Sequence, residues 1–182
     1  DDIYYWTSGP SAAEYADLLS TSQIIIKTVE PTAQVVLAAT AGTNLPFLDG
    51  VLRALQGSVG FDAAAAHPYH WSDVTGCLTA APGELHAIEL PGSGTALVNL
   101  KGGLLRQQQL FQDHGFGWPD LHITELGWPA CGFDRPAYVS LQQQADYLRQ
   151  VHVSATTDPE LAFVRGLLWY ANRDWALVPG DV

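Results

Sequence analysis

The sequence predicts an α/β protein in which helices cover a parallel sheet. Segments with helical spacing of apolar residues alternate along the chain with short apolar segments that are typical of strands. The short segments read as apolar on both faces, which is typical of parallel strands buried between layers of helices. No repeat, low-complexity tract or linker interrupts the 182 residues, so we expect one domain spanning residues 1–182.

Each expected helix has a periodic apolar stripe or a clear start and end signal. The first begins behind Ser11, because Ser11 and Glu14 form a capping-box pattern, and Pro31 ends it. Glycines 102 and 103 weaken the helical pattern of the third helix but do not abolish it. The three later helices are expected at residues 46–55, within 94–115, and at 140–155.

Four strands are expected, at residues 34–39, 61–66, 120–125 and 161–170. In parallel sheets of α/β proteins, chemistry collects beyond the carboxyl ends of the strands. The last three expected strands end in His67-Pro68-Tyr69, in Glu125, and in Trp169-Tyr170. Three such ends in series predict a functional site at this edge of the sheet.

The charge and motif content of the chain exclude several classes of protein. With 8 Lys and Arg against 19 Asp and Glu, the formal net charge is −11, and no basic cluster is available to bind nucleic acid or an anionic membrane surface. No apolar run approaches the roughly 20 residues of a membrane span. The G-x-G-x-x-G fingerprint, the Walker loop and the G-x-S-x-G elbow are all missing, so we expect no nucleotide cofactor and no α/β-hydrolase nucleophile.

Glu125 is the candidate nucleophile of the predicted site. An ionised carboxylate at the end of a buried strand is costly unless it is paired, hydrogen-bonded or functional. Retaining glycoside hydrolysis needs such a carboxylate beside the anomeric carbon, together with an acid about 5–5.5 Å away. The structural alternative is that Glu125 caps the next helix or pairs with an arginine.

His67 and Tyr69 are expected next to Glu125 if the strands follow one another in the sheet. A tyrosine hydroxyl there could keep the carboxylate ionised, and a histidine could bind a sugar hydroxyl; the alternative is a buried structural histidine. His67 and His70 have no third clustered ligand, so no metal is expected. Trp169 is the candidate platform for an apolar sugar face, with Trp71 and Trp128 as weaker additions, although a tryptophan there is equally suited to fill the core.

Three stretches, "FDAAAAHPYHW", "HITELGWP" and "GLLWYANRDW", resemble the second half of clan A glycoside hydrolases, especially the bacterial family 39 and family 5 types. The resemblance implies a (β/α)₈ barrel, of which this chain supplies strands five to eight. It also implies retaining hydrolysis of O-glycosyl bonds, with Glu125 as nucleophile, His67 and Tyr69 lining the pocket, and Trp169 beneath the reactive sugar.

The two cysteines, Cys77 and Cys131, are too few for a zinc site and too far apart for a C-x-x-C motif, which favours two unpaired thiols. The resemblance places them in neighbouring loops and so implies a disulfide. A disulfide fits an extracellular enzyme, whose signal segment would precede this sequence.

The sequence also departs from the family pattern, because the acid/base glutamate of the family belongs to an Asn-Glu-Pro motif that is not found here. We therefore expect a fragment that needs a missing amino-terminal half-barrel or self-association. Two other hypotheses stay open: a non-catalytic carbohydrate-binding or scaffold half-barrel, and an unrelated α/β domain in which Glu125 is structural.

Overall fold

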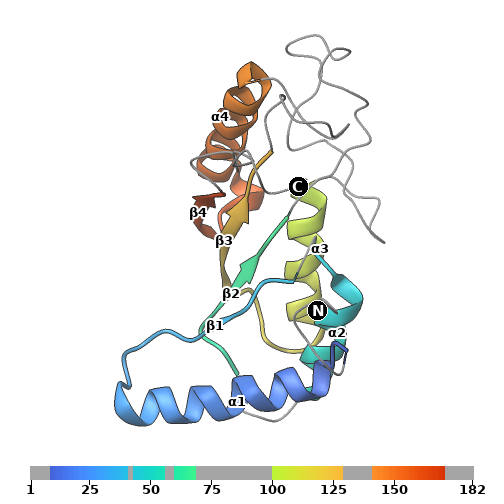
Figure 1. Cartoon of the computed structure of the whole chain (residues 1–182), viewed down its shortest axis with the longest axis vertical. Helices are drawn as coiled ribbons and strands as arrows, with labels where there is room; N and C mark the ends of the chain where they lie inside the picture. Colours follow the sequence, from blue (N-terminus) through green and yellow to red (C-terminus); the bar gives the residue numbers. More distant parts are fainter. Residues whose placement is uncertain (1–8, 41–42, 56–59, 69–99, 129–140, 171–182) are drawn as a thin grey trace, which may run out of the picture.

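The computed structural model describes residues 9–40, 43–55, 60–68, 100–128 and 141–170 (Figure 1). Helices and parallel strands alternate through these residues, and the strands form one sheet in the order β1-β2-β3-β4. The elements are α1 (Ala12–Val29), β1 (Val36–Leu37), α2 (Leu45–Ala54), β2 (Ala63–Ala66), α3 (Leu100–Asp113), β3 (Asp120–Leu126), α4 (Leu141–Thr157), a 3₁₀ turn (Pro159–Leu161) and β4 (Val164–Trp169). The predicted α/β class and parallel sheet are confirmed, and the strands follow one another in chain order.

The side chains of the sheet alternate between two environments. Ala64 pairs with Leu121 and Ala66 with Ile123, and all four side chains belong to the buried core. That core lies between the sheet and the helices, and Leu52 of α2, Leu104 of α3 and Val151 of α4 each contribute to it. One face of the sheet is therefore packed against helices, and the residues that alternate with these four point to the other face.

Strand β2 consists of four alanines, and all four are buried. The amide of Gln107 on α3, itself buried, donates a hydrogen bond from Nε2 to the carbonyl oxygen of Ala65 at 3.0 Å. Since alanine places only a methyl group on each face, helix and strand can approach closely enough for this side chain to reach the strand backbone.

The helix boundaries follow local signals in the sequence. Ser11 caps α1 by accepting a hydrogen bond from the backbone N–H of Glu14 (3.2 Å), as the capping-box pattern predicts, and the helix ends at Val29, before Pro31. Asn44 caps α2 in the same way, by accepting from the N–H of Phe47 at 3.2 Å. The glycines at 102 and 103 do not break α3.

The last strand begins later than the sequence predicts. Leu161, the residue expected to open the strand, instead ends the turn Pro159–Leu161. The turn forms because the Asp158 carboxylate accepts a hydrogen bond from the N–H of Glu160 (2.9 Å) and a proline at the first position favours a helical turn. Strand β4 therefore starts at Val164. Strand β1 is also shorter than the expected 34–39, and it lies at an edge of the sheet.

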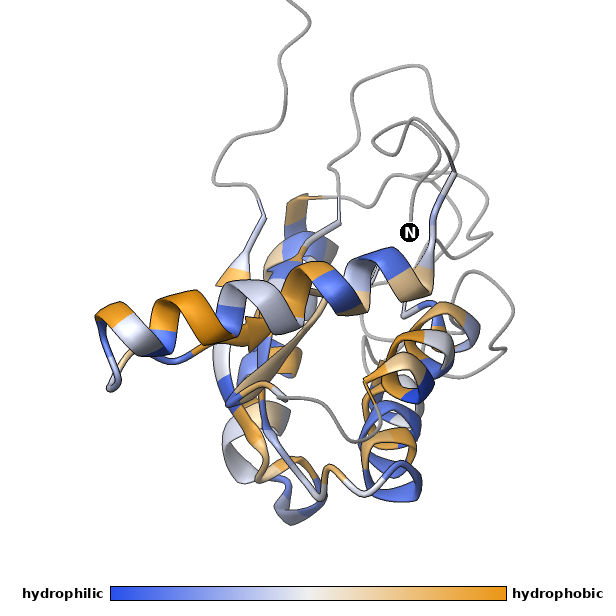
Figure 2. Ribbon diagram, turned by 90° about the horizontal axis from the view of Figure 1, so that it is seen from below, coloured by the Kyte–Doolittle hydropathy of each residue, from blue (hydrophilic) through white to orange (hydrophobic). Residues whose placement is uncertain are grey.

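Helix α1 carries two apolar stripes of which only one is packed. Ala16 and Leu19 are buried, whereas a second stripe at spacing i, i+7, i+8, i+11 is exposed and consists of Leu18, Ile25, Ile26 and Val29. In Figure 2, hydrophobic colour dominates the end of α1 that projects past the neighbouring elements. Among the described residues, no helix is long and apolar enough to span a membrane.

Candidate active site

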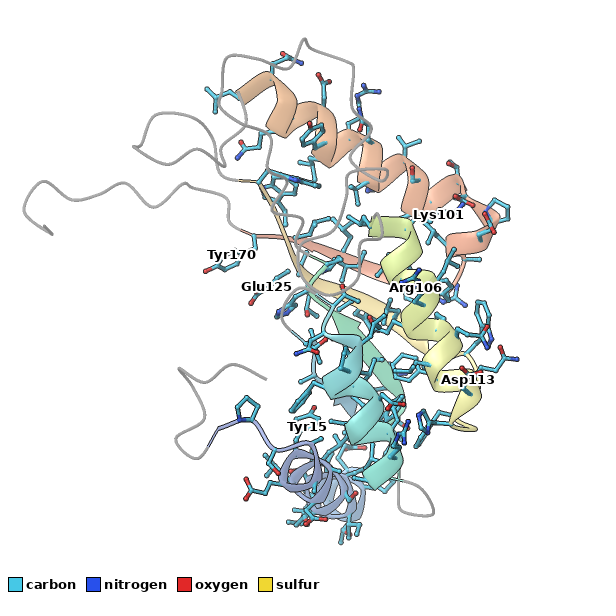
Figure 3. All side chains as sticks on the ribbon, turned by 90° about the vertical axis from the view of Figure 1, so that its right-hand side faces the viewer. Tyr15, Lys101, Arg106, Asp113, Glu125 and Tyr170 are labelled. Carbon is cyan, nitrogen blue, oxygen red and sulfur yellow. The ribbon has the colours of Figure 1, made fainter. Side chains whose placement is uncertain are left out.

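Three of the predicted site residues lie at the same edge of the sheet. His67 directly follows β2, Glu125 is the penultimate residue of β3, and Trp169 is the last residue of β4. Because these three strands are parallel neighbours, their carboxyl ends meet at one edge. In Figure 3 the side chain of Glu125 projects from the side of the sheet opposite to α3.

The imidazole of His67 lies between two groups of β3. Its Nδ1 atom is 3.6 Å from Oε2 of Glu125, slightly beyond hydrogen-bond distance, and its Nε2 atom is 3.0 Å from Oγ1 of Thr124. The side chains of His67 and Glu125 are 24% and 38% exposed, respectively, so both are partly buried and a solute could still reach them. The predicted proximity of His67 and Glu125 is therefore confirmed.

The electrostatic balance at His67 favours the neutral ring. Burial lowers the pKa of His67 below its usual value, and the nearby Glu125 carboxylate opposes that shift without overcoming it. At neutral pH the imidazole therefore carries a single proton, placed on one of its two nitrogens.

Both groups of β3 reach His67 because the strand is irregular at this point. Ile123 pairs with Leu167 and Leu126 pairs with Trp169, so the two residues Thr124 and Glu125 oppose only one residue of β4. In a regular strand, successive side chains point to opposite faces. The bulge brings Thr124 and Glu125 to the same ring, and bulges that re-aim a side chain are common beside active sites.

The open face of β3 is polar, contrary to the expectation that every strand is apolar on both faces. Leu121 and Ile123 are buried in the core, whereas His122 and Thr124 alternate with them and are only partly buried. His122 pairs with Gly166 of β4, and a Cβ atom built on that glycine would lie 2.8 Å from Nδ1 of His122. Gly166 therefore leaves the room that the His122 ring occupies.

The tryptophans of this edge form an aromatic cluster against α4. Trp128 is 4% exposed, with its ring centroid 5.0 Å from that of Tyr147 and 5.9 Å from that of Trp169. Gln144 of α4 donates a hydrogen bond to the Trp128 carbonyl oxygen at 2.6 Å. Trp128 is thus a core residue, which corrects the expectation that it adds to a sugar platform. Trp169 packs against the same core but keeps part of its surface exposed, so its platform role stays a prediction.

Two side chains to which the sequence analysis gave no role belong to this site. Thr124 contacts His67, and Tyr170 follows β4 with 47% of its surface exposed. The N–H of Tyr170 donates to the Leu126 carbonyl oxygen at 2.9 Å, and Figure 3 shows Tyr170 on the same side of the sheet as Glu125. The alternation of polar and apolar residues along "LHIT" carried a signal for Thr124, because period-2 alternation predicts a polar face.

Four predicted residues lie outside the described part of the chain: Tyr69, Trp71, Cys77 and Cys131. Their assignments, including the disulfide, stay sequence predictions. Within the described ranges, no cluster of three or more His, Cys, Asp or Glu side chains could hold a metal ion.

Comparison of the chain with models of known protein families and with curated proteins gives no match.

Proposed function

We propose that this chain carries the nucleophile of a retaining glycosidase, which hydrolyses O-glycosyl bonds of a poly- or oligosaccharide, and that Glu125 is that nucleophile. The observation that carries the proposal is the position of the Glu125 carboxylate. It is partly exposed at the carboxyl end of a central strand, and it lies 3.6 Å from an imidazole of the neighbouring strand. A site on adjacent strand ends holds its groups more rigidly than a site on loops.

We further propose that the four strands are strands five to eight of a (β/α)₈ barrel. The strictly sequential parallel order supports this, since each strand of such a barrel pairs with the next along the chain. The exposed apolar stripe of α1, beside the edge strand β1, also supports it. In a complete barrel a further helix of the outer ring would cover that stripe.

The proposed chemistry has two steps. A carboxylate oxygen of Glu125 attacks the anomeric carbon, the bond to the leaving-group oxygen breaks, and that oxygen departs with the bonding electron pair and takes up a proton. Water then adds to the anomeric carbon and displaces the carboxylate, losing one proton to a base. We assign no residue to the acid/base that serves both steps, so a test of Glu125 should not depend on it.

The charge and surface of the site suit a neutral sugar. The carboxylate can stabilise the positive charge that develops on the ring in the transition state, and a neutral His67 adds no positive charge of its own beside it. The exposed ring of Tyr170 on the same side of the sheet offers an apolar surface for a sugar face.

The test is covalent trapping with 2,4-dinitrophenyl 2-deoxy-2-fluoroglycosides. Dinitrophenolate leaves without protonation, and the fluorine slows hydrolysis of the intermediate, so a nucleophile can be labelled even where no acid/base is present. Gluco-, xylo- and manno-configured probes would be used as both anomers. We expect a stoichiometric burst of dinitrophenolate and a mass increase on the peptide that contains Glu125.

The Glu125→Gln variant should give no burst and no label. Glu30→Gln, the same chemical change on an exposed carboxylate at the end of α1, should label at the wild-type rate. Labelling that persists in Glu125→Gln would refute the assignment. Oligosaccharide binding by calorimetry, without labelling by any probe, would instead favour the carbohydrate-binding alternative.

A further inference from the structure

Three groups from two strands form a continuous line at the site. Oγ1 of Thr124 lies 3.0 Å from Nε2 of His67, and Nδ1 on the other side of the same ring lies 3.6 Å from Oε2 of Glu125. Thr124 and His67 are 57 residues apart in the sequence, so the fold and not local geometry brings them together.

The position of the single proton on His67 decides what the ring does to Glu125. With the proton on Nε2, the lone pair of Nδ1 would face the carboxylate oxygen, and the two negative regions would repel. With the proton on Nδ1, the ring presents an N–H to the carboxylate, and Nε2 is left as an acceptor. In the first tautomer the threonine hydroxyl would accept from Nε2–H, whereas in the second it donates to Nε2, and only there does the ring also present an N–H to Glu125.

We propose that Thr124 is a positioning residue: its hydroxyl donates to Nε2 of His67, fixes the Nδ1–H tautomer, and thereby directs that N–H at Glu125. Its effect on catalysis rests on the proposed function, whereas its effect on the tautomer does not.

The local structure suits Thr124 to this role. A β-branched side chain has few χ1 rotamers, so its hydroxyl is held in one direction. The bulge between Ile123 and Leu126 lets Thr124 and Glu125 reach the same ring from consecutive positions. The distance from Nδ1 to the carboxylate is long for a hydrogen bond, and such contacts often shorten only when substrate is bound. A ring that already has the correct tautomer needs only a small movement to complete the contact.

The first test is the tautomer of His67 in the wild-type protein. The ¹⁵N shifts of the six histidines would be recorded at neutral pH on a protein with ¹⁵N-labelled imidazoles, and the His67 signals assigned by their loss in His67→Gln. We expect a protonated Nδ1 and an unprotonated Nε2. A protonated Nε2 in the wild type would overturn the proposal without any variant.

The second test compares Thr124→Val, which removes the hydroxyl at nearly constant shape, with Thr124→Ser, which keeps it. We expect the valine variant to populate both tautomers and the serine variant to keep the wild-type pattern. The rate of trapping by the dinitrophenyl probes should fall about tenfold in Thr124→Val, corresponding to one lost hydrogen bond. Probe affinity should stay within about twofold, and Thr124→Ser should label near the wild-type rate.

The outcomes separate this inference from the proposed function. A valine variant with the wild-type tautomer and trapping rate would overturn the role of Thr124, even if Glu125 is the nucleophile. A tautomer that changes in Thr124→Val and is the wild-type one in Thr124→Ser supports that role. If no probe labels the protein in that case, only the glycosidase proposal fails.

Discussion

Replacing Gly166 with alanine is expected to destabilise the protein, although alanine suits a strand better than glycine does. The added Cβ would lie 2.8 Å from Nδ1 of His122, whereas ordinary contacts begin at 3.4 Å, so the ring must retreat by 3.4 − 2.8 = 0.6 Å to restore an ordinary contact. Gly166 is not among the glycines with positive φ, so backbone strain does not contribute to the effect.

Two opposing terms set the magnitude. Overpacking of this kind costs about 1–3 kcal/mol. Alanine lowers the conformational entropy of the unfolded chain, which stabilises the folded protein by about 0.4–1 kcal/mol where the backbone conformation suits alanine. The difference is a loss between about 0 and 2.6 kcal/mol, and its midpoint of about 1.3 kcal/mol lowers the melting temperature of a chain of this size by roughly 3–5 °C.

A double-mutant cycle measured by urea unfolding isolates the contact. In a His122→Ala background the clash is gone, so Gly166→Ala should become stabilising by about 0.4–1 kcal/mol. Gly60→Ala is the matched control, because its Cβ would make only an ordinary 3.6 Å contact with Phe116, and its effect should not depend on His122. If Gly166→Ala has the same effect in both backgrounds, the reasoning about His122 is wrong.

Three further predictions concern the scaffold. Phe111→Ala should lower the free energy of unfolding by about 3–5 kcal/mol, because the ring is fully buried. Hydrogen bonds from the Lys27 ammonium and from a backbone N–H lower the pKa of Asp62. Wild type should therefore be more stable than Asp62→Asn above about pH 5, and the difference should shrink as the pH falls below about 4, as acid titration of both proteins would show. Gln144→Leu removes the hydrogen bond to the Trp128 carbonyl and should cost about 1 kcal/mol in urea unfolding, with no loss if that contact is unimportant.

The order and type of the elements could be predicted because they depend on local patterns. Helical periodicity, the Ser11 cap and Pro31 located α1, and short apolar runs located the strands. The exception is instructive: "LAFVRGLLWY" is apolar throughout, yet its first residue belongs to a turn. The signal that starts the turn is Asp158-Pro159, which lies before the apolar run and competes with it.

The candidate site could be predicted only in part. His67 and Glu125 follow from the rule that parallel strands share a functional edge, and that rule needs no side-chain detail. The contact of Thr124 with His67 depends on a bulge in β3, where two residues face a single residue of β4. The sequence of one strand does not indicate where its pairing with the next strand becomes irregular. Trp128 shows the reverse problem, because a tryptophan after a strand fits either a sugar platform or a core until its neighbours are known.

The four alanines of β2 have a consequence for how this protein can vary. A run of four alanines matches no functional motif, so a motif search would not select it. All four are nevertheless buried, and the Gln107 amide that reaches the Ala65 carbonyl leaves little space above that strand. In a saturation mutagenesis screen for folded protein, we expect Ala63–Ala66 to accept fewer substitutions than the chemically distinctive Thr124 or Glu125. Residues Ala63–Ala66 would then tolerate substitution least, and selection for folding would preserve them even after activity was lost.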